Sequence, residues 1–269
     1  RDLAFPWINY TSALAADALF FNSDFHRRAF LDALPGLVGR FHDYQELDLI
    51  DTIAAKAQVL PPGIDLARLD LRKNQEPTTE NRTELLGSRF SVLGSPVLLW
   101  NSRWEYDKGP EAFFEALGAL EEQGVDFRLI VVGEHIDPRN PVFVAARERF
   151  AGRALAWGYA PSDAAYAELL HQADIVVSTA IQEFFGIGVI EAMYCGCVPI
   201  LPRRLSYPEI LPSDYHADCL YDDQADLVAK LRMAIDNLPT LKARDFRGVA
   251  AAYDWRPMAA RYDAALLPE

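Results

Sequence analysis

Two glutamates, Glu183 and Glu191, flank a glycine-bearing turn in the second half of the chain. The apolar residues 175–178 predict a buried parallel strand, and the loop after them passes through Gly186 and Gly188 into a helix. A helix N-terminus offers unpaired backbone N–H groups and partial positive charge, and glycine lets a ligand approach the backbone closely. The segment therefore suits an anionic or hydroxyl-rich ligand.

The two carboxylates can take different parts of such a ligand. Glu183 precedes the helix and can accept hydrogen bonds from one part of it, whereas Glu191 lies inside the helix and can chelate a vicinal diol such as a ribose. We therefore predict that one carboxylate binds a sugar and the other a nucleoside. The simpler alternative is that Glu183 is a helix N-terminal charge favoured by the dipole and Glu191 a solvated helix residue. Two glutamates alone leave both interpretations open.

Two cations follow the strand predicted at 97–100. Arg103 and Lys108 lie in the loop after this strand, and ligands bind at the carboxyl ends of strands in doubly wound sheets. The planar fork of Arg and the mobile charge of Lys suit a diphosphate in a cleft where no metal is needed. The alternative is that both side chains are solvated surface charges.

Weaker signals follow the next two predicted strands. Gly133 with Glu134, and Gly158 with Tyr159, fall at the same edge of the sheet and could line a base pocket with backbone groups and one aromatic face. Tyr159 also fits a packing residue with a solvated hydroxyl.

Other chemistries find little support. The glycine pair at 186 and 188 lacks the third glycine of a dinucleotide fingerprint, and no Gly-x-Ser-x-Gly hydrolase elbow is present. His135 and His171 have no partner at metal-ligand spacing, so we expect ordinary surface or capping histidines. The net charge of −13 opposes general nucleic-acid binding, although it does not exclude a local basic site.

Composition indicates a globular chain with one large or two ordinary domains, because 51% of its 269 residues are hydrophobic. No stretch of about 18 apolar residues appears, and the first residues lack the layout of a signal peptide, so we expect a cytoplasmic protein without a membrane span. Cys195 and Cys197 are too close together for an ordinary bridge or a zinc pair, and Cys219 is alone. We expect three small buried thiols.

Alternating strands and helices from residue 97 onward predict a parallel sheet in one complete Rossmann-like domain, 97–252. The helix from Pro110 shows every expected signal, with Pro in its first turn, an apolar face and Gly124 beyond its end. The predicted strands are 97–100, 127–132, 155–157, 175–178, 198–201 and 219–221. The predicted helices are 110–123, 142–150, 161–172, the helix after Gly186, 224–236 and 241–252.

The residues before this domain predict only part of another. Strands are expected at 18–21 and 57–60, with a helix that begins after Ser23 as N-cap. Two strands cannot fill a domain, and no strand precedes them, so we expect a chain that lacks an N-terminal portion. We assign 1–72 to a partial N-terminal Rossmann-like domain and the polar stretch 73–96 to a linker.

Together the motifs resemble the retaining nucleotide-sugar glycosyltransferases with two Rossmann domains, the GT-B fold. The motifs are Arg103 with Lys108, the strand end 178–179, and the runs 183–186, 191–193 and 196–199. More narrowly, the chain is similar to the tRNA-queuosine α-mannosyltransferase family over nearly its whole length. The runs that carry this likeness are 99–108, 110–114, 157–159 and 207–210.

The resemblance implies a GDP-mannose donor, no metal or other cofactor, and transfer with retention to the cyclopentenediol of queuosine in a tRNA anticodon. Carried over by position, Arg103 and Lys108 hold the diphosphate and Glu191 the ribose, while Gly158 and Tyr159 lie near the base. Glu183 and the backbone of residues 184–187 hold the donor sugar, which adds Phe184, Phe185, Gly186 and Ile187 to the site. Glu183, Arg103 and Lys108 are the expected catalytic residues.

Two departures from the family accompany this likeness. Ser102 stands where a glycine is common before the phosphate-binding arginine, and the first strands with the histidine-bearing acceptor loop are expected before Arg1. The final segment, 253–269, resembles the helix that crosses back onto the N-terminal domain. Alternative functions are the same fold acting on a lipid or glycan acceptor, a nucleotide-sugar-binding module without turnover, and a nucleotide-sugar epimerase.

Overall fold

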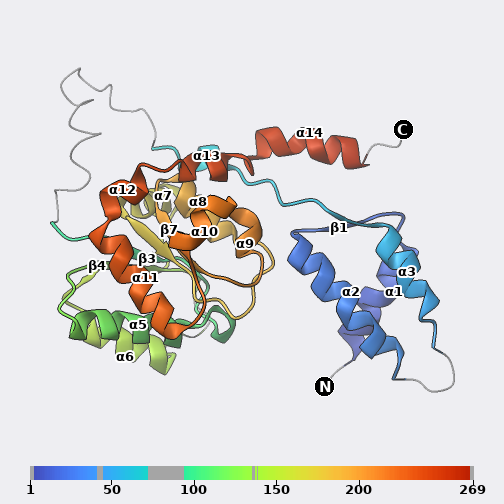
Figure 1. Cartoon of the computed structure of the whole chain (residues 1–269), viewed down its shortest axis with the longest axis horizontal. Coiled ribbons are helices and arrows are strands. Elements are labelled where there is room, and N and C mark those ends of the chain that lie inside the picture. Colours follow the sequence, from blue (N-terminus) through green and yellow to red (C-terminus); the bar gives the residue numbers. More distant parts are fainter. Residues whose placement is uncertain (1–2, 41–44, 72–93, 135–136, 138, 267–269) are drawn as a thin grey trace. The chain divides into compact units, whose positions relative to one another are not determined.

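The computed structural model of the 269-residue chain describes residues 3–40, 45–71, 94–134, 137 and 139–266 (Figure 1). They form two compact units, one made of Arg1–Pro62 with Ala259–Glu269 and the other of Gly63–Met258. Residues 63–71 thus pack in the second unit, whereas the sequence analysis placed them in the first domain. Most of the predicted linker lies outside the described residues, and its role stays a prediction.

The second unit contains a six-stranded parallel sheet with the strand order β5-β4-β3-β6-β7-β8. Its strands are β3 (Val97–Trp100), β4 (Arg128–Val132), β5 (Ala154–Gly158), β6 (Ile175–Val177), β7 (Val198–Pro202) and β8 (Leu220–Tyr221). The chain moves outward from β3 through β4 to β5 and then returns to place β6 on the other side of β3. The switch point between β3 and β6 is where such a sheet opens a ligand crevice.

Helices cover both faces of this sheet. Helix α5 contacts α6 and α11, and α8 contacts α7 and α13. Figure 1 shows α5 and α6 on one side of the sheet and α7, α8 and α13 on the other. The helices of this unit are α5 (Pro110–Glu122), α6 (Pro141–Arg149), α7 (Asp163–Gln172), α8 (Ile187–Tyr194), α9 (Tyr207–Ile210), α10 (His216–Cys219), α11 (Gln224–Asp236), α12 (Leu238–Lys242) and α13 (Phe246–Ala251).

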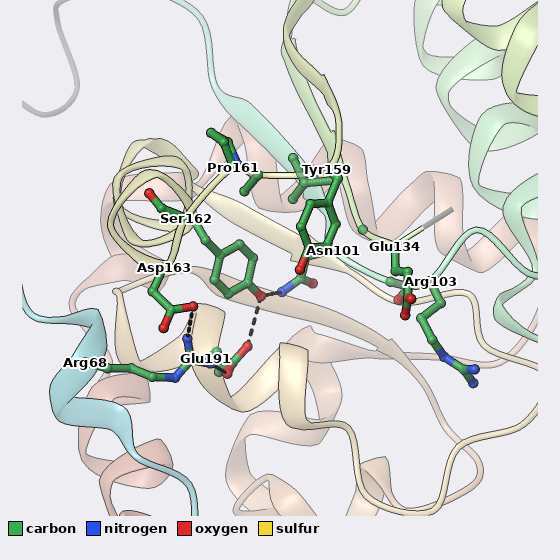
Figure 2. A pocket seen from close by; sticks show the side chains of 14 residues that line it. Arg68, Asn101, Arg103, Glu134, Tyr159, Pro161, Ser162, Asp163 and Glu191 are labelled. Atoms are coloured by element: carbon green, nitrogen blue, oxygen red, sulfur yellow. Dashed lines mark hydrogen bonds and ion pairs between the residues drawn. The ribbon is translucent and has the colours of Figure 1, made fainter. Parts of the chain in front are cut away.

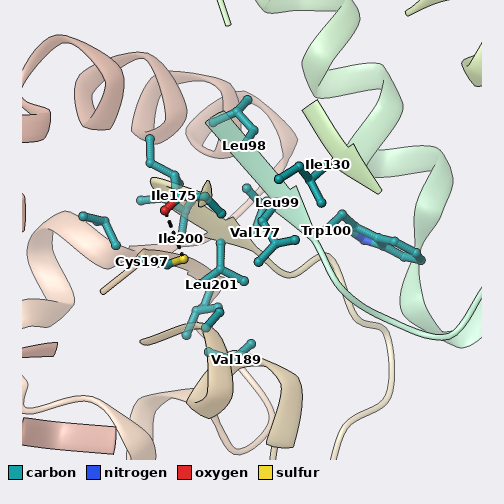
Figure 3. Packing of buried hydrophobic residues seen from close by; sticks show 14 of the residues in the cluster. Leu98, Leu99, Trp100, Ile130, Ile175, Val177, Val189, Cys197, Ile200 and Leu201 are labelled. Atoms are coloured by element: carbon teal, nitrogen blue, oxygen red, sulfur yellow. Dashed lines mark hydrogen bonds between the residues drawn. The ribbon is translucent and has the colours of Figure 1, made fainter. Parts of the chain in front are cut away.

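The core lies between these layers. All four residues of β3 are buried, as continuous apolar strands require in a parallel sheet covered on both faces. Figure 3 shows side chains of β3, β6 and β7 meeting there, with Cys197 among them. Cys195, Cys197 and Cys219 are all buried free thiols, which confirms the expectation from their spacing.

The structure confirms the predicted strands to within one residue at either end, but one helix prediction is wrong. The segment 241–252 is not one helix, because it contains the end of α12 and the whole of α13. Asp245 interrupts it and caps α13, since its carboxylate accepts a hydrogen bond from the Gly248 amide at 2.7 Å.

The first unit contains a two-stranded parallel sheet of β1 (Leu19–Phe21) and β2 (Ala57–Val59). Its helices are α1 (Ala4–Ala15), α2 (Asp24–Val38) and α3 (Asp48–Ala55), and α14 (Trp255–Leu266) joins it from Ala259 onward. Ser23 caps α2 as predicted, because its hydroxyl accepts from the His26 amide at 3.1 Å. Within the described ranges, no helix is both long enough and apolar enough to cross a membrane.

Candidate functional site

The loops after β3 and β6 are tied together at the switch point. The Thr179 hydroxyl donates to the Lys108 carbonyl at 3.0 Å, and the Ile181 amide donates to the Asp107 carbonyl at 2.8 Å. Gly109 has φ 61°, and a Cβ there would lie 2.3 Å from the Thr179 carbonyl oxygen. Glycine is therefore required at this position, where it lets the loop turn into α5 directly beside Thr179.

Lys108 and Glu183 meet in this region. Lys108 is buried, and its Nζ donates to the Gln182 carbonyl at 2.9 Å and to Glu183 Oε2 at 3.3 Å. Glu183 Oε1 accepts from the amides of Phe184 at 3.0 Å and Phe185 at 3.2 Å. The alternative of a solvated surface charge is thus wrong for Lys108. Glu183 also fixes the turn that follows it.

A cavity of about 300 Å³, here named the Glu183 cavity, opens beside this pair. It brings together five of the predicted site residues. Phe184 and Phe185 do not line it, and the Phe185 ring packs against Tyr253 instead, with ring centroids 5.1 Å apart. The lining residues are Asn101, Ser102, Arg103, Lys108, Val177, Glu183, Gly186, Ile187, Gly188, Val189 and Tyr207.

A second cavity of about 330 Å³, the Glu191 cavity, is drawn in Figure 2. Residues 101–103 line both cavities, so the two adjoin along the loop after β3. Each volume is near the lower end of the roughly 300–1,000 Å³ typical of small-molecule sites. The lining residues are Arg68, Asn101, Ser102, Arg103, Val132, Gly133, Glu134, Tyr159, Ala160, Pro161, Ser162, Asp163, Tyr166 and Glu191.

Glu191 lies on α8 at the wall of this cavity and is only 5% exposed, so the alternative of a solvated helix residue is wrong. Its Oε1 is paired with the Arg68 guanidinium, and its Oε2 accepts from the Tyr166 hydroxyl at 2.9 Å (Figure 2). Burial raises the pKa of Glu191, while Arg68 and Tyr166 act in the opposite direction. Burial and the neighbouring Glu191 also raise the pKa of Tyr166.

Arg103 and Tyr159 complete the set of predicted side chains. The Arg103 side chain is 53% exposed, pairs with Glu105 at 2.9 Å and lines both cavities. Tyr159 lines the Glu191 cavity and is 69% exposed, so its interpretation as a packing residue is wrong. Gly158 is not among the lining residues; its carbonyl accepts from the Gly133 amide at 3.1 Å.

Several lining residues are not predicted by any sequence motif. Arg68 lies on the 3₁₀ helix η1 (Leu66–Leu69), far from any motif, and no local pattern pointed to it. Asp163 and Tyr166 lie in the first turn of α7, and only their position after a strand of the sheet could have indicated them. Asn101 directly follows β3, and its place at the carboxyl end of the strand was a usable signal.

His171 Nε2 lies 2.9 Å from the Leu69 carbonyl oxygen, which is a structural contact. His135 lies outside the described residues. No group of three or more His, Cys, Asp or Glu side chains with metal-binding geometry occurs in the described part of the chain.

Comparison with known families assigns the second unit. Residues 81–245 match the family described as glycosyl transferases group 1. The chain belongs to this family. Residues 1–64 of the chain match a second family, described as tRNA-queuosine alpha-mannosyltransferase N-terminal.

Curated relatives of this chain agree with these matches. It is 33% identical over 231 residues to a tRNA-queuosine alpha-mannosyltransferase of Drosophila melanogaster, covering 86% of this chain and 58% of that protein. It is 24% identical to a GDP-mannose-dependent alpha-(1-6)-phosphatidylinositol dimannoside mannosyltransferase of Mycobacterium tuberculosis, covering 82% of this chain and 54% of that protein. The chain thus spans little more than half the length of these relatives.

Solved structures show that this chain has the predicted α/β fold of the GT-B class. Sucrose-phosphate synthase from Thermosynechococcus elongatus aligns with a TM-score of 0.69 at 18% identity, covering 98% of this chain and 61% of that one. Anabaena HepE, solved with UDP and glucose, aligns with a TM-score of 0.68 at 18% identity, covering 96% of this chain and 66% of that one. At these identities the likeness concerns the fold alone.

Proposed function

We propose that this glycosyltransferase transfers mannose from GDP-mannose to queuosine in a tRNA anticodon, with retention of the anomeric configuration. In this proposal the protein works in the cytoplasm, where it meets its tRNA, and needs no metal or other cofactor. The described chain supplies the donor-binding half of the reaction.

The observation that carries the proposal is the pair of adjoining cavities that share Arg103. A nucleotide sugar has a nucleoside at one end, a sugar at the other and a diphosphate between them. Glu191 in one cavity would take the ribose, with the base near Tyr159. Glu183 in the other would take the sugar, and Arg103 would bind the diphosphate where the cavities adjoin.

The chemistry then depends on stabilising the leaving diphosphate. Lys108 and Arg103 offset its charge, and the first turn of α8 offers backbone N–H groups and the positive end of the helix dipole. Glu183 keeps Lys108 and its own turn in place. The acceptor hydroxyl attacks from the face that the diphosphate leaves. Catalysis by this chain is positioning and charge stabilisation.

Support for a tRNA acceptor comes from the N-terminal match and the Drosophila relative, which is more similar than the relatives that act on lipid-linked acceptors. A lipid or glycan acceptor is the competing proposal. The Mycobacterium relative is a GDP-mannose-dependent phosphatidylinositol dimannoside mannosyltransferase, so a GDP-mannose donor alone does not decide between the two acceptors.

A donor titration and an acceptor assay test the proposal separately. Calorimetry with GDP, UDP, ADP and GDP-mannose should show selective GDP binding, which Arg103→Ala should weaken by about tenfold through the lost charge-assisted contact. Labelled mannose should then pass to tRNA that carries queuosine and not to the same tRNA with guanosine in its place. Transfer to a phospholipid or glycan instead would contradict the acceptor. Donor binding without transfer would support a non-catalytic binding module. Conversion of the nucleotide sugar without any acceptor would support an epimerase.

A further inference from the structure

Arg68 stands apart from the predicted site residues because it comes from outside the sheet and its helices. It lies on η1, upstream of the complete Rossmann-like domain, yet its guanidinium reaches the Glu191 cavity and is paired with Glu191 Oε1. A second nitrogen of the same group lies 3.3 Å from Asp163 Oδ1. Figure 2 shows the Arg68 side chain extending from its helix toward Asp163 and Glu191.

The hydrogen bonds of the Glu191 carboxylate can be counted. An ionised carboxylate has about four acceptor sites, two on each oxygen. Arg68 uses one on Oε1 and the Tyr166 hydroxyl uses one on Oε2. One site on each oxygen remains, at the wall of the Glu191 cavity. Two acceptor sites on adjacent oxygens match the two hydroxyls of a vicinal diol.

This arrangement works only while Glu191 is ionised. A buried carboxylate is costly without a positive partner, and burial already raises the pKa of Glu191. Among the described residues, the groups that act on it are Arg68 on η1, with Tyr166 and Asp163 on α7. Tyr166 is neutral and Asp163 is negative, so Arg68 alone in this set supplies positive charge.

Arg68 is not needed to hold η1 in place. Leu66 and Leu69 flank it and are fully buried, so the core fixes the backbone of this short helix. The residue directly after η1 is also held in place, because the Arg247 guanidinium donates to Asp70 at 2.8 Å. The Arg68 side chain is 31% exposed and lines the Glu191 cavity, so a ligand in that cavity can lie beside the Arg68–Glu191 pair.

We propose that Arg68 is a positioning residue for the donor: it keeps the Glu191 carboxylate charged and oriented so that the site selects nucleotides with a free ribose diol. This inference rests on the proposed function, because it takes the Glu191 cavity as the nucleoside site. Arg68 acts through Glu191 and touches neither the diphosphate nor the sugar.

The test compares GDP with 2′-deoxy-GDP, which lacks one hydroxyl of the diol. The native chain should prefer GDP by about tenfold, the usual effect of one hydrogen bond to a charged group. Arg68→Met should remove most of this preference, because GDP loses the support of both hydroxyl contacts whereas 2′-deoxy-GDP, which keeps one hydroxyl, is weakened less. Arg68→Lys, which keeps a charge, should restore part of the preference.

A pH series adds a readout that loss of packing would not change. Without Arg68, the pKa of Glu191 rises further, so the increase of GDP affinity with pH should extend to higher pH in Arg68→Met than in the native chain. Arg247→Met is the matched control, because it removes the other arginine that anchors this segment without touching Glu191. It should keep both the preference and the native pH profile.

Two kinds of result overturn the inference. In one, Arg68→Met keeps the native preference and pH profile; in the other, it loses both ligands equally, as an anchor or a phosphate contact would. Glu191→Gln distinguishes this failure from failure of the proposed function. If Glu191→Gln also keeps the native preference for GDP, the ribose does not bind at Glu191, and both proposals fall.

Discussion

The Asn101 side-chain amide joins the loop after β3 to helix α8, because its Nδ2 donates to the Gly188 carbonyl at 2.7 Å. The same nitrogen donates to the Tyr166 hydroxyl at 3.0 Å, and Tyr166 donates to Glu191 at 2.9 Å. Asn101 lines both cavities. A continuous chain of hydrogen bonds therefore begins where the cavities adjoin and ends at the buried carboxylate.

Replacing Asn101 by Asp tests this chain with almost no change of shape. The new oxygen would face the Gly188 carbonyl and offer no donor, so we expect the free energy of unfolding to fall by about 1–3 kcal/mol. GDP affinity should fall as well, because the Tyr166 hydroxyl, which donates to Glu191, loses the donor that orients it. Urea unfolding and calorimetry measure the two effects. The control is Asn237→Asp, where the amide donates to Met233 at the surface; equal effects of the two changes would contradict the role of Asn101.

Gly133 packs directly against the loop after β3, so substituting it tests whether the position of this loop matters for binding. A Cβ at this position would lie 1.8 Å from the Ser102 carbonyl oxygen, so the loop that carries Arg103 must move in Gly133→Ala. We expect a loss of about 1–3 kcal/mol in stability from overpacking, together with weaker GDP binding. At Gly152 an added Cβ meets nothing within 4 Å, and Gly152→Ala should be close to neutral in both thermal unfolding and calorimetry. A neutral Gly133→Ala would show that the loop adapts freely.

The sequence predicted the sheet well because its strands are continuous apolar runs between clear turn signals, as at 97–100 and 175–177. It predicted Lys108 and Glu191 from motifs whose residues lie near one another along the chain. It could not predict Arg68, which meets Glu191 from 123 positions away, because that pairing depends on tertiary packing of a segment without a motif. The break at Asp245 was missed for a local reason. In a helical pattern, an aspartate that caps a new helix cannot be told from an aspartate on the exposed face of a continuous helix.

Lys108 offers a test of charge at the diphosphate end of the site. Lys108→Met keeps much of the buried stem but removes the ammonium that bonds Gln182 and Glu183. We expect GDP affinity to fall by about tenfold to a hundredfold, with a smaller salt dependence, because a cation near the diphosphate is lost. Lys230→Met is the control, since Lys230 lies on α11, lines neither cavity and donates to the Ala217 carbonyl. Unchanged binding in Lys108→Met at every salt concentration would remove Lys108 from the site.

The raised pKa of Glu191 predicts opposite effects of acid on stability and on binding. A carboxyl whose pKa is higher in the folded state binds its proton more readily there, so stability increases as the pH falls from neutral through that pKa toward the ordinary value of 4.5. GDP affinity should decrease over the same range, because the protonated carboxyl accepts the diol poorly. Glu191→Gln should show neither change. The free energy of unfolding and the GDP affinity are measured against pH for the native chain and for Glu191→Gln. The same pH dependence in both proteins would contradict the raised pKa of Glu191.

A crystal structure of this chain with GDP would show whether one nucleotide occupies both cavities. We expect the ribose hydroxyls within hydrogen-bond distance of the Glu191 carboxylate and the diphosphate beside Arg103, with its terminal phosphate directed toward Lys108. A nucleotide bound with its ribose away from Glu191, or with its diphosphate outside the 101–103 loop, would contradict this expectation.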